Sequence, residues 1–301
     1  MTLADLTTRF ALDGQLRFVE GPGGLLFAEI DNHLGTASLC LQGAHVTTFR
    51  PKDQDEPVIW LSEHAKFAPA KSIRGGAPIC WPWFGPHATE SSFPGHGFAR
   101  TVMWEVTDTA ALESGETRLA LSLVESEQTR AQWPCASRVS LEVTVGATLT
   151  MTLSSTNLGS TPMQIGEALH TYFQIGDIAA IRVLGLEGSE YVDKVEGGVR
   201  KSETGAVTFA DEVDRVYLNT EATCMIEDSR LGRRIVVAKR GSRSTVLWTP
   251  WRDKADKMGD FGDDGWRRMV CVESANALDN VVSVAPGQTH EMQVEYRAES
   301  L

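Results

Sequence analysis

Strict alternation of apolar and polar residues is the feature that most constrains how this chain can fold. Leu149, Met151 and Leu153 alternate with threonines, and the pattern recurs at 102–106, 119–123 and 292–296. A period of two places one face of a segment in the core and the other in water, which predicts strands. Further strands are predicted at 25–31, 36–42, 45–50, 139–145, 234–239, 244–248, 268–273 and 281–285.

Apolar residues with a sustained helical spacing are missing from the chain, and only short helical turns near 61–67 are expected. Many short strands without intervening helices are typical of an antiparallel sandwich or barrel. The sequence therefore predicts an all-β protein with few short helices. We expect residues 1–301 to form a single domain, with roughly 15–20 strands in two packed sheets.

The charge balance excludes several classes of partner. The 301 residues include 28 Lys and Arg against 40 Asp and Glu, so the formal net charge is −12. Nucleic-acid binding and attraction to anionic membranes both depend on a basic surface, so we expect neither. No run approaches the ~18 apolar residues of a membrane span, and the first residues lack the order of a secretion signal.

The five cysteines are scattered and odd in number, with no CxxC pair. Neither a disulfide framework nor a structural zinc site is predicted from this spacing. We expect reduced thiols and a cytoplasmic location.

Two long segments, 71–100 and 250–268, do not have a strand pattern and are rich in Gly, Pro, aromatic and charged residues. Long irregular loops on a rigid β scaffold usually carry function or are disordered. Their tryptophans favour order, because burying a large ring offsets the entropy lost when a loop is fixed.

Two titratable residues in apolar, strand-like runs are candidates for proton transfer. His170 follows Ala168 and Leu169, and its imidazole could act as a general acid or base or simply be a buried, hydrogen-bonded histidine. Glu273 ends the run 269–273, and its carboxylate is either functional or emerges into water. Burial would raise its pKa toward the range that is useful for proton transfer.

Arg74 and Arg100 lie beside small residues at either end of the first long loop, in Arg74-Gly75-Gly76 and the run 95–100. A guanidinium suits phosphate or carboxylate, although a surface ion pair is the simpler interpretation. His96 either binds a hydroxyl or stabilises the loop.

Aromatic residues near these loops offer a platform for a sugar. The apolar C–H faces of sugars pack on aromatic rings, so Trp83 and Trp248 are candidate contacts, with core packing as the alternative. Asp214 is either a hydroxyl acceptor or a turn residue.

The order of these motifs resembles one family. RGGAPICWPWFG at 74–85, HGFAR at 96–100, LHTYF at 169–173, VDRVY at 213–217, WTPW at 248–251 and CVESAN at 271–276 are similar to the hexose-6-phosphate mutarotases of the aldose 1-epimerase superfamily. The resemblance covers about residues 20–298. It implies a galactose-mutarotase-like antiparallel β-supersandwich and an isomerase without cofactor or metal. Thr249 departs from the asparagine that is more frequent in the family.

The resemblance also implies roles for single residues. The family's histidine falls on His170 and its catalytic glutamate on Glu273. Sugar contacts fall on His96 and Asp214, and Arg74 and Arg100 resemble a phosphate clamp. The implied partner is a small sugar phosphate, with glucose 6-phosphate foremost, bound by a monomer or weak homodimer.

The implied chemistry is the exchange of α and β anomers through ring opening. A base removes the proton of the anomeric hydroxyl while an acid protonates the ring oxygen, and Glu273 and His170 are assigned these roles in the opening step. The alternatives are a sugar-phosphate sensor without activity, an epimerase of free sugars, and a β-sandwich lyase or hydrolase. A hydrolase would normally need two carboxylates across the scissile bond.

Overall fold

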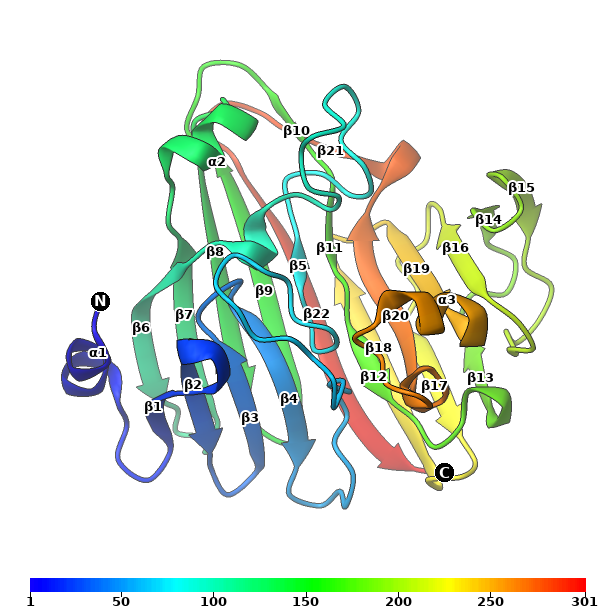
Figure 1. Cartoon of the computed structure of the whole chain (residues 1–301), viewed down its shortest axis with the longest axis horizontal. Helices are drawn as coiled ribbons and strands as arrows, with labels where there is room; N and C mark the ends of the chain where they lie inside the picture. The colour runs from blue at the N-terminus through cyan, green and yellow to red at the C-terminus, as the bar shows by residue number, and fades with distance from the viewer.

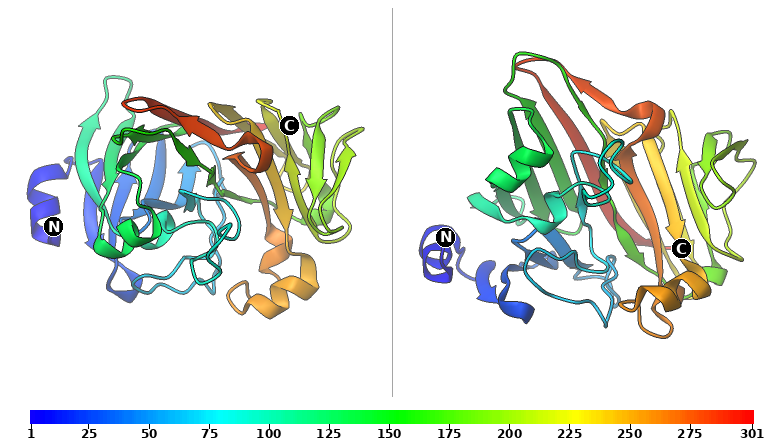
Figure 2. Two further views of the ribbon diagram at one scale, coloured as in Figure 1. Left: turned by 90° about the horizontal axis from the view of Figure 1, so that it is seen from above. Right: turned by 45° about the horizontal axis from the view of Figure 1, so that its top comes forward.

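The computed structural model describes residues 1–301 as four antiparallel sheets (Figures 1 and 2). The longest strands form an eight-stranded sheet, here called the long sheet. Its strands, in spatial order, are β13 (Ile181–Leu184), β17 (Cys224–Asp228), β18 (Arg233–Arg240), β22 (Thr289–Ser300), β9 (Leu149–Asn157), β8 (Ser137–Val145), β7 (Thr117–Leu123) and β6 (Trp104–Ala111).

A second eight-stranded sheet, here called the site sheet, carries most of the candidate residues. Its strands, in spatial order, are β15 (Val199–Ser202), β14 (Glu190–Asp193), β16 (Val213–Tyr217), β19 (Ser244–Thr249), β20 (Met269–Asn276), β11 (Glu167–Leu169) and β5 (Ile79–Cys80), and β12 (Tyr172–Gln174) also pairs with β20.

Two smaller sheets complete the fold. One contains β1 (Leu16–Glu20), β2 (Leu26–Asp31), β3 (Gly35–Cys40) and β4 (His45–Pro51), and the other pairs β10 (Met163–Ile165) with β21 (Val282–Val284). The sequence predicted two packed sheets, and the structure has four. The first four strands form a separate antiparallel meander, β1–β4, which lies in front of the long sheet in Figure 1.

The alternating segments are strands, as predicted, and their apolar faces form one core. Register pairs such as Leu141 with Leu153 keep like faces together, because antiparallel neighbours share the same parity. A single cluster of 63 buried residues reaches from α1 to β22. The antiparallel all-β fold expected from the sequence is confirmed.

Residues 61–67, where short helical turns were expected, contain one hydrogen-bonded turn, in which the Ala65 N–H donates to the Ser62 carbonyl. The turn does not extend into a helix, and Ser62 is bound from outside: its N–H donates to the Arg74 carbonyl and its hydroxyl to the Asp260 carbonyl. The three α-helices are α1 (Leu3–Phe10), α2 (Glu127–Gln132) and α3 (Trp251–Met258). None of them has the length and apolar character needed to cross a bilayer.

Both predicted long loops lie next to the site sheet. Residues 71–100 contain only β5 and the short 3-10 helix Ala99–Thr101. Residues 250–268 contain α3, which ends where Gly259 adopts a left-handed φ of 66°, a conformation that favours glycine. α3 lies beside β20 in Figure 1 and projects from the site sheet in Figure 2.

Candidate active site

A cavity of about 290 Å³ opens between the site sheet, the first long loop and α3. This volume is at the lower end of the ~300–1,000 Å³ range of small-molecule sites. Its lining comprises Ser72, Ile73, Arg74, Pro78, Phe84, His96, Arg100, His170, Tyr172, Lys194, Asp214, Val246, Trp248, Lys254, Met258 and Glu273. A larger hollow of about 580 Å³ beside β1–β4 has no buried titratable group, so we place the site in the smaller cavity.

Glu273 lies on β20, the longest of the strands that are buried at every residue. All eight residues of β20 are buried, and the side chain of Glu273 is 1% exposed. It pairs in register with Val246 of β19, which also lines the cavity. Because Oε2 of Glu273 has no hydrogen-bond partner, the protein leaves that oxygen available to a ligand.

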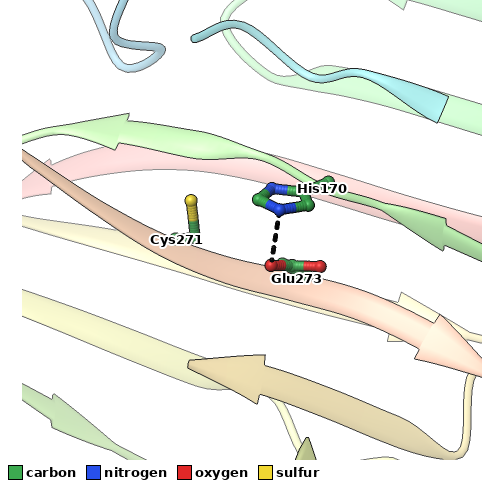
Figure 3. A group of neighbouring side chains, drawn as sticks. All are labelled: His170, Cys271 and Glu273. Carbon is green, nitrogen blue, oxygen red and sulfur yellow. Dashed lines mark ion pairs between the residues drawn. The ribbon is translucent and has the colours of Figure 1, made fainter. Parts of the chain in front are cut away.

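His170 lies in the two-residue break between β11 and β12, not within a strand. Its N–H donates to the Pro78 carbonyl at 3.0 Å, and its ring stacks on Tyr172 with centroids 5.1 Å apart. Its Nε2 lies 3.2 Å from Oε1 of Glu273 (Figure 3). The structure therefore brings together the two residues that the sequence proposed for proton transfer.

The surroundings favour the neutral form of both groups. Burial, reinforced by the nearby Asp214, raises the pKa of Glu273 well above its usual range. Burial, reinforced by the positive charge of Arg100, lowers the pKa of His170 well below its usual range. Over the neutral pH range the pair therefore holds a single proton.

His96 and Asp214 extend the site away from this pair. The ring of His96 lies 5.8 Å from that of His170, and burial with the neighbouring Arg100 lowers the pKa of His96 to about 3. His96 is therefore an uncharged imidazole near neutral pH, suited to hydrogen bonding with hydroxyls. Burial raises the pKa of Asp214, which comes from β16 on the opposite side of the cavity.

Arg74 is held rigidly at the cavity wall. Its Nε donates to Asp260 at 3.1 Å, its Nη1 donates to the Tyr172 hydroxyl at 3.0 Å, and its guanidinium lies 5.1 Å from the Phe261 ring centroid. The backbone beside it is equally fixed, because a Cβ on Gly76 would overlap the ring of the buried His45. Glycine is thus required for the approach of this loop to β4.

Arg100 projects from the short helix Ala99–Thr101 and donates from Nη2 to the Gly95 carbonyl at 2.9 Å. It forms no ion pair with a carboxylate, unlike Arg74. The structure therefore brings both predicted arginines to one cavity, where Arg74 is paired with a carboxylate and Arg100 is not.

The two tryptophans predicted as sugar contacts differ in position. Trp248 of β19 lines the cavity, with its ring 6.0 Å from His170. Trp83 does not line it: the indole N–H donates to the Pro94 carbonyl at 2.9 Å, and the ring packs on Phe93 and Phe98. Trp83 therefore braces the first long loop, and its contact with a sugar stays a prediction.

Among the cavity residues that sequence reasoning missed, Lys194, Lys254 and Tyr172 carry polar groups that could bind a substrate. Tyr172 belongs to the same motif as His170 and could have been found from it. Nothing in the sequence near Lys194 and Lys254 distinguishes them from surface lysines, since only folding brings β14 and α3 to the cavity.

One group of side chains has the donor types of a metal site. The ligand atoms of His170, Cys271 and Glu273 lie within 4.8 Å of one another, and both β20 side chains project to the same side (Figure 3). Burial raises the pKa of Cys271 well above its usual value, which opposes the thiolate that a metal needs. A cation would also displace the proton that the pair holds, so the arrangement suits proton transfer better.

Comparison with known proteins agrees with this geometry. The family model described as Aldose 1-epimerase matches residues 27–297. A protein of Escherichia coli K12 is 39% identical over 83% of both chains, and one of Salmonella typhimurium is 38% identical over 90% of this chain and 88% of its own. Both carry the name "Putative glucose-6-phosphate 1-epimerase".

Solved structures share the architecture. A crystal structure from Salmonella typhimurium, described as a "putative mutarotase", superposes with a TM-score of 0.90 at 33% identity and covers 97% of this chain and 96% of its own. A galactose mutarotase related enzyme from Lactobacillus acidophilus superposes with a TM-score of 0.73 at 13% identity, covering 91% and 97%. At that identity the second likeness shows the fold alone, and the fold is galactose-mutarotase-like.

Proposed function

The chain belongs to the aldose 1-epimerase family, and we propose that it interconverts the α and β anomers of hexose 6-phosphates, with glucose 6-phosphate as the preferred substrate. It is an isomerase. The observation that carries the proposal is the contact of 3.2 Å between Nε2 of His170 and Oε1 of Glu273 in a cavity that four cationic side chains line.

The pair supplies an acid and a base at one place. In the opening step the Glu273 carboxylate takes the proton of the anomeric hydroxyl, and the His170 imidazolium donates a proton to the ring oxygen as the bond from C1 to that oxygen breaks. The open aldehyde then rotates about its C1–C2 bond. In closure the C5 hydroxyl attacks the other face of C1, His170 takes its proton, and Glu273 returns its proton to the carbonyl oxygen.

The protonation state that burial favours for His170 and Glu273 is the one that follows ring opening in this cycle. With burial favouring neutral groups, the shared proton resides on Glu273 and His170 is a free base, which is the state that accompanies the open-chain aldehyde. The cyclic sugar needs the carboxylate and the imidazolium. The positive charges of Lys194 and Arg100 lower the pKa of Glu273 toward that form, and a bound phosphate stabilises the imidazolium.

The cations of the cavity support a phosphorylated substrate. Long-range attraction does not, because the net charge is −12 and repels an anion at a distance. Binding must come from short-range contacts, for which Arg74 and Arg100 were the candidates from the sequence and Lys194 and Lys254 are added by the structure.

Mutarotation of freshly dissolved α-glucose 6-phosphate, followed by polarimetry or NMR, tests the proposal. We expect the enzyme to accelerate approach to anomeric equilibrium, and to do so far better for glucose 6-phosphate than for glucose. Binding without acceleration would identify a sensor, equal rates would identify an epimerase of free sugars, and either result would refute the proposal.

A cytoplasmic location is part of the proposal. All five cysteines are free thiols, and four of them are buried. Unpaired thiols suit a reducing compartment.

A further inference from the structure

The four cations of the cavity are unequally available to an anion. Arg74 already binds Asp260 and the Tyr172 hydroxyl, and the Nη2 of Arg100 donates to the Gly95 carbonyl. Nζ of Lys254 donates to Glu212 at 2.6 Å. Lys194 has neither an ion pair nor a side-chain hydrogen bond, and its Nζ lies 5.2 Å from the Phe84 ring centroid.

Lys194 also lies at the opening of the cavity. It is exposed, whereas the side chains of His170 and Glu273, which line the same cavity, are 12% and 1% exposed. It follows directly after β14, and its N–H donates to the Asp214 carbonyl of β16 at 2.8 Å. This backbone bond fixes the base of the side chain at the edge of the site sheet, while the four-carbon stem leaves the ammonium free to move.

A hexose 6-phosphate has only one orientation that suits these positions. Its anomeric carbon must reach the buried pair, because that carbon carries the reacting oxygens. The C6 phosphate is carried on C5, on the far side of the ring oxygen from C1, and extends beyond the ring, so it can reach the opening, where a dianion keeps part of its hydration.

We propose that Lys194 is the specificity-determining residue that binds the 6-phosphate at the cavity opening, an assignment that rests on the proposed function. This assignment adds a further cation to the two arginines that the sequence proposed for phosphate binding. Arg74 must share its charge with Asp260, whereas Lys194 forms no ion pair with a carboxylate, although its charge acts on Asp214 and Glu273 from a distance. A charge-assisted bond to a previously unpaired ammonium replaces no bond within the protein.

Anomerisation kinetics of Lys194→Gln test this role. We expect the KM for glucose 6-phosphate to rise about 10-fold, equivalent to about 1.4 kcal/mol, and kcat to change by less than the KM does, because Lys194 acts on the reacting pair only through its charge on Glu273. Lys194→Arg should restore most of the loss, and Lys194→Glu should exceed it. Inorganic phosphate, used as a competing ligand, should inhibit Lys194→Gln more weakly than the wild type.

Lys201→Gln is the matched control. Lys201 lies in the neighbouring strand β15, pairs with Asp193 and Glu196, and does not line the cavity. Lys201→Gln changes the net charge by the same amount as Lys194→Gln. An equal rise of KM in both variants would mean that overall charge causes the effect, and would overturn the proposal.

The remaining outcomes separate this inference from the proposed function. If Lys194→Gln keeps its KM while Arg100→Ala loses it, the phosphate is bound by the arginines and the inference fails, although the function stands. If Lys194→Gln weakens free glucose and glucose 6-phosphate equally, Lys194 only shapes the cavity and the inference fails. If the wild type itself does not prefer glucose 6-phosphate, the proposed function fails first.

Discussion

At the scale of single residues, the proposed mechanism assigns opposite tasks to His170 and Glu273, which are in direct contact. Neither residue is unusual in the sequence, and each had a simple structural interpretation. The proposed roles rest on their placement: β20 and the break after β11 hold Nε2 and Oε1 3.2 Å apart, and both side chains are largely buried.

Removing either group should abolish most of the activity while the protein stays folded. His170→Ala and Glu273→Gln are each expected to lower kcat by about 100-fold or more, since each general acid or base contributes ~100- to 10,000-fold. kcat is measured by polarimetry on variants whose circular dichroism spectrum matches that of the wild type. Near-normal kcat in a folded variant would remove that residue from the mechanism.

The pH dependence of kcat should be broad. The lowered pKa of His170 means that the pair takes a second proton only at acid pH, and the raised pKa of Glu273 means that it loses the last one only at alkaline pH. We therefore expect a nearly constant kcat between about pH 6 and 8, falling on both sides. A titration within that window, centred near the ordinary imidazole pKa of ~6.5, would contradict the shared-proton description.

At the scale of elements, the loop that carries Arg74 depends on close contact between backbone and β4. Gly76→Ala should destabilise the protein by about 3 kcal/mol or more, because the added Cβ overlaps His45 and φ is 72°. Gly14→Ala is the control: its φ of 68° is similar, but nothing lies within 4 Å of the Cβ, so about 1 kcal/mol is expected. Urea unfolding of both variants measures the difference, and equal losses would mean that backbone strain alone decides.

A buried ion pair joins three strands behind the active site. Nε2 of His290 on β22 lies 2.8 Å from Oε1 of Glu167 on β11, and the amide of Asn276 on β20 donates to the same oxygen. Each catalytic residue lies three positions from a member of this cluster. Burial disfavours the imidazolium, but the hydrogen bond and the charge of Glu167 outweigh it and raise the pKa of His290.

The sign of the resulting stability effect follows from that direction. A pKa that is higher in the folded protein than the ~6.5 of an unfolded histidine means that His290 stabilises the fold fully below pH ~6.5 and loses this contribution as the pH rises through the folded value. Denaturant unfolding of wild type and His290→Gln should differ by roughly 1–3 kcal/mol at pH 6 and converge toward alkaline pH. A constant difference would show that His290 acts by packing alone.

Whether a strand could be predicted from the sequence depended on its length. β7, β8, β9 and β22 contain seven to twelve residues, enough for alternation to be recognised. β14 and β15 have four residues each, too few for a period, and they hold Lys194 at the cavity. Motif order proposed His170 and Glu273 as the catalytic pair, and the structure places them in contact, whereas sequence order does not show which side of the first long loop Trp83 faces.

At the scale of the whole molecule, the continuity of the core predicts one cooperative unit. The 63-residue cluster includes Leu6 of α1, Trp60, Trp266 and Tyr296 of β22 without interruption. Unfolding followed by tryptophan fluorescence and by far-ultraviolet circular dichroism should therefore give coincident transitions. Two separated transitions would divide the chain into independent units and contradict the single-domain prediction.

The position of β22 has a consequence for biosynthesis. This strand follows all others along the chain, yet it lies between β18 and β9 in the middle of the long sheet (Figure 1). While a ribosome is still translating residues 289–300, β6–β9 and the β13–β17–β18 group cannot join, and the facing sides of β9 and β18 remain unpaired. Such open edges invite pairing with other nascent chains, so this sheet cannot be completed until β22 has left the ribosome, and chaperones that cover exposed strand edges would act in that interval.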